Sequence, residues 1–162
     1  MEKCNRAVYQ RSRVAALERT VCTMTNAVQV YDYRFPNTDI AIMRFQVRLS
    51  EIAQSLGFEV ESWEEGGLGL AHGIFLKLPS GRVVVLLELQ HAIDHYGEMG
   101  PYVHVDAGAV AEFGVEPLID EVLTTLGLSD QLVDWRATSE QQQFAIDRMK
   151  LVTAYKKEKG IT

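Results

Sequence analysis

Three short hydrophobic runs in the middle of the chain have the length and composition of β-strands, and they span residues 72–78, 82–89 and 102–106. Residues 79–81 read Pro-Ser-Gly, which favours a tight turn because proline presets its own φ and glycine accepts a positive φ. Residues 83–87 are apolar on both faces, which is typical of a central strand covered on both sides. Since a lone hairpin is marginal in water, the pattern predicts an antiparallel sheet covered by helices.

The segment before these strands has the spacing of an amphipathic helix. The pattern predicts a helix that begins near residues 37–39, ends before Gly57, and is followed by a strand at residues 58–63. The apolar positions that define this helix recur mostly every three or four residues: Ile42, Phe45, Leu49, Ile52, Ala53 and Leu56.

Two further helices are predicted in the C-terminal half. Pro117 stands at a favourable first helical position and Gly127 supplies a stop, so a helix is expected over residues 117–126. Ser139 and Gln142 have the spacing of a capping box, which predicts the start of a last helix.

The segments between these elements are predicted as turns and loops. Ser129 is a candidate cap for a short turn through residue 135, and residues 91–101 form a glycine-containing loop with one optional helical turn over residues 92–96. The pattern assigns no element to residues 107–113. Alternation places three polar side chains on one face of the strand before them: Tyr102, His104 and Asp106.

The N-terminal part divides from the rest of the chain by its pattern. Residues 6–27 have a rough helical spacing, and residues 31–36 are extended, as an edge strand or a linker. The predicted organisation is therefore an N-terminal helical and extended segment (residues 1–36) and a single α+β domain (residues 37–162) with a three- to four-stranded, mainly antiparallel sheet.

Composition narrows the cellular locations expected for the protein. No run approaches eighteen consecutive apolar residues, so no membrane span is expected, and the charged N-terminus does not resemble a secretory signal. Cys4 and Cys22 both lie near the N-terminus and lack metal-ligand spacing. These features predict a cytoplasmic protein without disulfide bonds.

Charge is distributed unevenly along the chain. Residues 37–134 carry four basic and sixteen acidic side chains, a net charge of −12, whereas residues 1–36 and 135–162 each carry a net charge of +3. Phosphate contacts need clustered lysine and arginine, so the acidic middle argues against nucleic acid as the main partner. It favours a basic protein partner, and a solvated acidic surface that keeps the protein soluble is the alternative.

One cluster of titratable residues is a candidate for metal chemistry. A helical turn after residue 90 would place His91 and His95 on one face, and His104 could supply a third nitrogen ligand. The general-base glutamate of the known zinc helix motif is absent, because Ala92 follows the first histidine. A metal-dependent hydrolase therefore stays as an alternative. The full cluster comprises Glu88, His91, Asp94, His95, His104 and Asp106.

Other catalytic machinery is not evident in the sequence. The cysteines have no neighbouring histidine, and no nucleophile-elbow motif is present. The glycine-rich stretch at residues 66–73 lacks the lysine and helix of a phosphate loop. We therefore expect a binding protein that uses no cofactor. Turns or caps account for four serines: Ser62, Ser80, Ser129 and Ser139.

Over roughly residues 37–158, the order of elements and the acidity resemble small bacterial immunity proteins, the cytoplasmic antidotes to polymorphic and contact-dependent growth-inhibition toxins. This resemblance implies neutralisation of a toxin by direct binding, and no residue role follows from it. The order is also similar to that of dimeric type III secretion chaperones, which would imply a homodimer with an extended peptide ligand. The long helix after Ser139, with no strand between it and Pro117, counts against the second resemblance. The oligomeric state stays open.

The residues expected to bind a basic toxin domain combine carboxylates with aromatic anchors. Carboxylates would orient the partner and speed association, and aromatic side chains would supply affinity. The predicted set is Glu59, Glu61, Trp63, Glu64, Glu65, Tyr96, Glu98, Tyr102, Glu112, Asp120 and Glu121.

Overall fold

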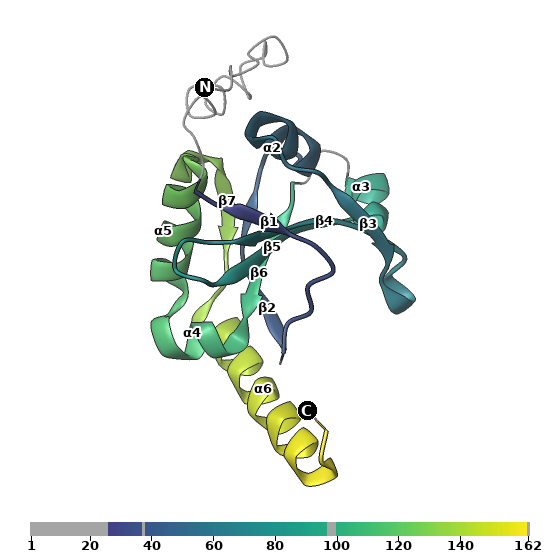
Figure 1. The fold of residues 1–162 in the computed structure, drawn as a ribbon, viewed down its shortest axis with the longest axis vertical. Helices are drawn as coiled ribbons and strands as arrows, with labels where there is room; N and C mark the ends of the chain where they lie inside the picture. Colours follow the sequence, from purple (N-terminus) through teal and green to yellow (C-terminus); the bar gives the residue numbers. More distant parts are fainter. Residues whose placement is uncertain (1–25, 37, 97–99, 162) are drawn as a thin grey trace.

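The computed structural model describes residues 26–36, 38–96 and 100–161, and within these ranges the chain is an α+β domain built on an antiparallel sheet (Figure 1). The sheet has seven strands in the order β1-β4-β5-β6-β2-β7, and β3 also pairs with β4. The α+β class is confirmed, whereas the expected three to four strands is an undercount. The strands are β1 (Val28–Val30), β2 (Asp39–Phe45), β3 (Glu61–Glu64), β4 (Leu70–Lys77), β5 (Val83–Leu89), β6 (Tyr102–Asp106) and β7 (Val133–Arg136).

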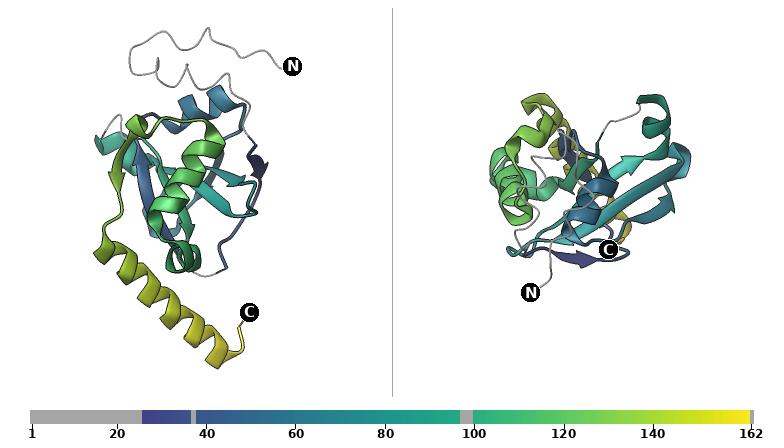
Figure 2. Two further views of the ribbon diagram at one scale, coloured as in Figure 1. Left: turned by 90° about the vertical axis from the view of Figure 1, so that its left-hand side faces the viewer. Right: turned by 90° about the horizontal axis from the view of Figure 1, so that it is seen from above.

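Helices of different lengths surround the sheet in the described ranges. The α-helices are α2 (Leu49–Leu56), α3 (Gln90–Tyr96), α4 (Ala107–Phe113), α5 (Val115–Leu126) and α6 (Ser139–Lys159), and two 3₁₀ turns are η1 (Gly66–Leu68) and η2 (Asp130–Leu132). Seen from above, α5 and α3 lie on opposite sides of the sheet (Figure 2). The 21-residue α6 projects from the body at the end opposite α2 (Figures 1 and 2). No helix in the described ranges combines the length and hydrophobicity that crossing a membrane requires.

The central hairpin confirms the predicted strands. β4 and β5 pair over seven residue pairs, from Ala71 opposite Leu89 to Lys77 opposite Val83. The turn between them closes with a hydrogen bond from the Leu78 amide to the Arg82 carbonyl (2.7 Å), and its glycine has a φ of 91°. Glycine accepts this conformation without the steric penalty that a side chain would impose.

Alternation along the strands separates a packed face from an open one. Ile74, Leu86 and Val103 are fully buried on the face that packs against α2, α4 and α5 in one hydrophobic core. Burying each such side chain stabilises the fold by about 1.5–3 kcal/mol relative to leaving it exposed. Residues of opposite parity point to the other face, where Phe75, Val85, Leu87, Tyr102 and His104 line a cavity.

The predicted helix over residues 37–56 is wrong in its first half. Residues 39–45 form β2, which lies between β6 and β7, and only residues 49–56 are helical. Register irregularities between Ala41 and Met43 and after Arg44 break the period-2 alternation of β2. A bulge inserts a residue into the pattern, so its buried positions fall at spacings that imitate a helix.

Shorter elements also differ from the prediction. Residues 90–96 and 107–113 form α3 and α4, and residues 133–136 form β7 where a turn was expected. The last helix does have a capping box, but it is formed by Thr138 and Gln141, one residue before the predicted pair. Ser129 caps η2 as expected, through a hydrogen bond from the Gln131 amide.

The N-terminal region is described only from residue 26. Residues 28–30 form β1, which pairs with β4, so the sheet begins before the expected boundary at residue 36. The helix predicted over residues 6–27 falls almost entirely outside the described residues.

Candidate functional site

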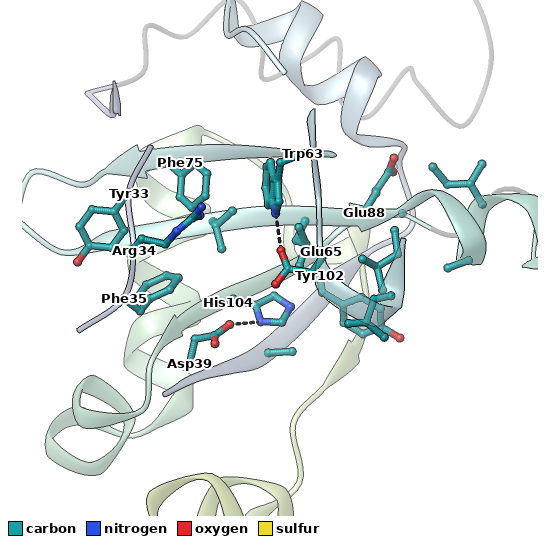
Figure 3. Close-up of a pocket in the computed structure, with 18 of the residues that line it drawn as sticks. Tyr33, Arg34, Phe35, Asp39, Trp63, Glu65, Phe75, Glu88, Tyr102 and His104 are labelled. Atoms are coloured by element: carbon teal, nitrogen blue, oxygen red, sulfur yellow. Dashed lines mark hydrogen bonds and ion pairs between the residues drawn. The ribbon is translucent and has the colours of Figure 1, made fainter. Parts of the chain in front are cut away.

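A cavity of about 710 Å³ lies on the open face of the sheet, opposite the hydrophobic core (Figure 3). Side chains from β2, β4, β5 and β6 form its floor. The segment at residues 33–35, the β3–η1 region, α3 and α6 supply its walls. Its volume falls within the range of sites for small organic ligands, which is roughly 300–1,000 Å³.

Four aromatic side chains form one wall of the cavity. The Trp63 and Phe75 ring centroids are 5.5 Å apart, those of Phe75 and Tyr33 are 6.4 Å apart, and Tyr33 meets Phe35 edge-on at 5.3 Å. Trp63 occupies its place because Gly73 lies beneath it: a Cβ atom built on that glycine would come within 2.6 Å of Trp63 Cη2. The wall offers large apolar surfaces on which a flat ring can pack.

At the floor of the cavity, His104 pairs with Asp39 from the neighbouring strand. The His104 Nδ1 and Asp39 Oδ2 atoms are 2.8 Å apart. This hydrogen bond is the largest cause that holds the pKa of Asp39 below its ordinary value. The ionised carboxylate only accepts hydrogen bonds, so Nδ1 carries a proton and donates it. The other ring nitrogen points away from Asp39 into the cavity (Figure 3).

The other two carboxylates around the cavity also accept hydrogen bonds from the protein. Glu65 accepts one from Trp63 Nε1, as the dashed line in Figure 3 shows. Glu88 is 6% exposed and its carboxylate points toward α2, where it accepts from the Leu49 amide (2.8 Å) and from Arg48 Nε (3.2 Å). It therefore satisfies the first amide of α2, for which Arg48 at the N-cap supplies no side-chain acceptor.

Tyr102 is held in place by groups on two neighbouring strands. Arg44 lies with its guanidinium 5.6 Å from the centre of the Tyr102 ring, and Trp135 meets that ring edge-on at 5.5 Å. Arg44 is fixed in turn by a bidentate ion pair with Asp134, at 2.9 and 3.1 Å. This support presents a rigid aromatic edge to the cavity.

The residues predicted to bind a partner are spread over separate surfaces. Trp63, Glu65 and Tyr102 line the cavity. Glu61 and Glu64 lie on β3, and Glu59 precedes that strand. Helices α4 and α5, on another part of the domain, carry three further acidic residues: Glu112, Asp120 and Glu121. Glu98 and the Tyr96 side chain lie outside the part that the structure describes.

The proposed three-histidine metal site is not supported by the geometry. His91 and His95 do share one face of α3, with ring centroids 4.2 Å apart, but His104 pairs with Asp39 at the cavity floor. Among the described residues, no three histidine, cysteine or acidic side chains are grouped so that they could hold a metal ion.

A hydrogen-bonded chain that the sequence did not suggest joins β3, β4 and α3. The Ser62 hydroxyl lies 2.7 Å from His72 Nδ1, and His72 Nε2 lies 2.7 Å from Gln90 Oε1. Gln90 donates through its amide nitrogen to Asp94 (2.9 Å), which orients its oxygen toward the histidine. His72 Nε2 is therefore the protonated nitrogen, and Nδ1 accepts from the Ser62 hydroxyl. Ser62 is thus a strand residue with a histidine partner, and the expectation that a turn or cap explains it was wrong.

The cavity lining combines large apolar rings with a few polar groups at fixed positions. Its described lining includes an available imidazole nitrogen but no serine, threonine or cysteine that could act as a nucleophile. Aromatic surface and a few polar groups at fixed positions suit recognition of a small molecule. Comparisons of the chain with known protein families, curated proteins and solved structures found no match.

Proposed function

We propose that this protein binds a small organic molecule with a flat apolar ring in the cavity on the open face of its sheet, and that it acts by binding without catalysing a reaction. The observation that carries the proposal is the aromatic wall of Trp63, Phe75, Tyr33 and Phe35 beside a cavity of about 710 Å³. A ring held between this wall and the floor of β5 and β6 would bury apolar surface on both faces, at about 25 cal/mol per Å² removed from water.

The rigid supports of the cavity add to this proposal. Trp63 rests on Gly73 and donates to Glu65, while Tyr102 is fixed by Arg44 and Trp135. Side chains that are already ordered lose little conformational entropy when a ligand binds.

A neutral fluorescent dye can test the site directly. The chain has two tryptophans, so a Trp135→Phe variant leaves Trp63 in the cavity as the sole tryptophan donor. N-phenyl-1-naphthylamine bound in the cavity should accept energy from Trp63 and show a saturable, enhanced emission. Absence of saturable energy transfer would refute the proposal.

A matched pair of substitutions controls for non-specific binding of the dye. Ala41 lies at the cavity floor, so Ala41→Phe should fill part of the space and weaken binding at least about tenfold, through lost contacts and overpacking. Ala154 is exposed on α6 outside the cavity, and Ala154→Phe should leave binding unchanged. Equal effects of the two variants would place the dye elsewhere.

The second candidate is recognition of a basic protein partner, such as a toxin domain, along the outer edge of β3. Among the described strands, β3 pairs only with β4, so its other edge can accept an extended segment. Glu59, Glu61, Glu64 and Glu65 lie on or beside it and would attract lysine and arginine.

A labelled peptide of alternating lysine and valine tests this candidate. The peptide should bind the native protein with an affinity that falls as salt rises, and Glu61→Lys with Glu64→Lys should weaken it. Reversing Glu112 and Asp120, which lie on other elements, changes the net charge equally and should have little effect. Binding that responds equally to both pairs would show attraction to net charge alone and remove the edge from consideration.

A further inference from the structure

The cavity differs from the rest of the described protein in how its arginines are partnered. Each arginine away from the cavity forms an ion pair with a carboxylate: Arg44 with Asp134, Arg48 with Glu88, Arg82 with Glu121 and Arg136 with Glu116. Arg34 and Arg148 line the cavity, and neither makes a hydrogen bond or ion pair with a residue that the structure describes. Among the arginines that the structure describes, the two without a hydrogen-bonded carboxylate partner therefore lie at the same site.

The carboxylates around the cavity, unlike the two arginines, already accept hydrogen bonds from the protein. Asp39 accepts from His104, Glu65 from Trp63, and Glu88 from the α2 terminus. Donors of the protein thus bind the cavity carboxylates, whereas the N–H groups of Arg34 and Arg148 make no hydrogen bond to a described residue. A ligand that complements this arrangement supplies acceptors and negative charge.

The positions of the two arginines allow both to meet a ligand on the aromatic wall. Arg34 extends from the segment at residues 33–35 toward the middle of the cavity, near the Phe75 ring (Figure 3). Arg148 lies on α6 and lines the cavity. Its charge contributes to lowering the pKa of Asp39, though less than the His104 hydrogen bond does. Its field therefore reaches the floor of the cavity, where His104 presents a free ring nitrogen.

We infer that the ligand carries an anionic group, such as a carboxylate or sulfonate, beside its apolar ring, and that Arg34 and Arg148 recognise this group while Trp63 and Phe75 hold the ring. This inference rests on the proposed function, because it specifies the ligand of the same cavity. Planar guanidinium groups suit planar oxyanions, which can accept two hydrogen bonds from one arginine.

Two dyes that share one ring skeleton test the anionic group of the ligand separately from the proposed binding of its ring. N-phenyl-1-naphthylamine is neutral, and 8-anilinonaphthalene-1-sulfonate adds a sulfonate to the same rings. Energy transfer from Trp63 in the Trp135→Phe protein reports the binding of each. We expect the sulfonate to bind about tenfold more tightly, because a hydrogen bond to a charged group contributes at least about 1.4 kcal/mol, which corresponds to tenfold in affinity.

Substitution of the arginines then identifies the cause. Arg34→Gln with Arg148→Gln should weaken binding of the sulfonate about tenfold more than binding of the neutral dye, and so remove the preference for the sulfonate. Lys150→Gln, on the exposed surface of the same helix and outside the cavity, is the control and should affect neither dye. Circular dichroism of each variant checks that the fold is retained.

Each outcome decides one of the two statements. Equal affinity for the two dyes, or a preference that survives loss of both arginines, overturns the anionic ligand and leaves the ring-binding cavity standing. If neither dye shows saturable energy transfer from Trp63, the cavity itself is not a binding site and both statements fail.

Discussion

Replacing Glu88 tests the link between the end of β5 and the start of α2. Its carboxylate is 6% exposed and accepts hydrogen bonds from the Leu49 amide at 2.8 Å and from Arg48 Nε at 3.2 Å. In Glu88→Ala the buried amide loses its acceptor, which costs about 1–3 kcal/mol. Loss of a negative charge at the helix N-terminus adds about 0.3–1 kcal/mol. Arg48, whose side chain is 34% exposed, stays in contact with water when Glu88 is removed and therefore adds little to the loss.

The expected loss of unfolding free energy is therefore about 3 kcal/mol for Glu88→Ala and about 1 kcal/mol for Glu88→Gln, which keeps an acceptor oxygen. Urea unfolding followed by circular dichroism measures both, and the midpoint should fall without a change in slope. Glu64 is exposed on β3, and Glu64→Ala should change stability by less than about 0.5 kcal/mol. Hydrogen exchange should accelerate at the Leu49 amide first. A Glu88→Ala protein as stable as the Glu64→Ala control would refute the role of this carboxylate.

Three further predictions concern the cavity and the last helix. Gly73→Ala should displace Trp63, because the new Cβ would lie 2.6 Å from its ring. The readouts are a red-shifted tryptophan emission and weaker dye binding. An unshifted emission spectrum would contradict this packing. The hydrogen bond from His104 lowers the pKa of Asp39, so the stability this carboxylate contributes is fully present above its ordinary pKa of 3.8 and is lost as pH falls through the lower folded value. Asp39→Asn should accordingly flatten that part of a stability–pH curve, and parallel curves would contradict it. Thr138→Ala removes the cap of α6 and should cost about 1 kcal/mol of helix stability, measured as local hydrogen exchange in its first turn.

Local sequence patterns were sufficient to predict the elements whose neighbours in sequence are also their neighbours in space. β4 and β5 are joined by a turn with its own signal, and the prediction for α5 came from Pro117 near its start and the glycine stop at residue 127. β2 was missed because its partners, β6 and β7, lie far away along the chain, and because its bulge changed the period of its pattern. The short strands β1 and β7 carry too few residues for alternation to be visible.

The residues of the candidate site likewise fall into two groups, those that local sequence patterns predicted and those that they could not predict. Alternation correctly placed Tyr102 and His104 on one face of a strand. The partner of His104 could not be predicted, because Asp39 belongs to a segment assigned to a helix and lies 65 positions away. The contact of Trp63 with Gly73 needed the register between β3 and β4, which no local signal provides. Cavity residues thus depend on long-range strand pairing, whereas the sheet they belong to is visible locally.

The two candidate functions should respond differently to salt, because charge in the folded protein is arranged differently from charge along the chain. Arg34 and Arg148 come from the basic ends of the sequence, and the fold brings both to a cavity whose floor belongs to the acidic middle segment. At physiological ionic strength, charges separated by more than about 8 Å are largely screened. Added salt weakens both the attraction of the arginines for an anionic ligand and the repulsion from the net charge of −6, and these changes oppose each other. Binding of a basic peptide beside Glu61 and Glu64 has no such compensation, because local and net charge attract it alike. If the cavity and the β3 edge are separate sites, we therefore expect different effects of salt on the two ligands. Binding of 8-anilinonaphthalene-1-sulfonate should be nearly independent of salt, whereas binding of the basic peptide should weaken steeply as salt rises.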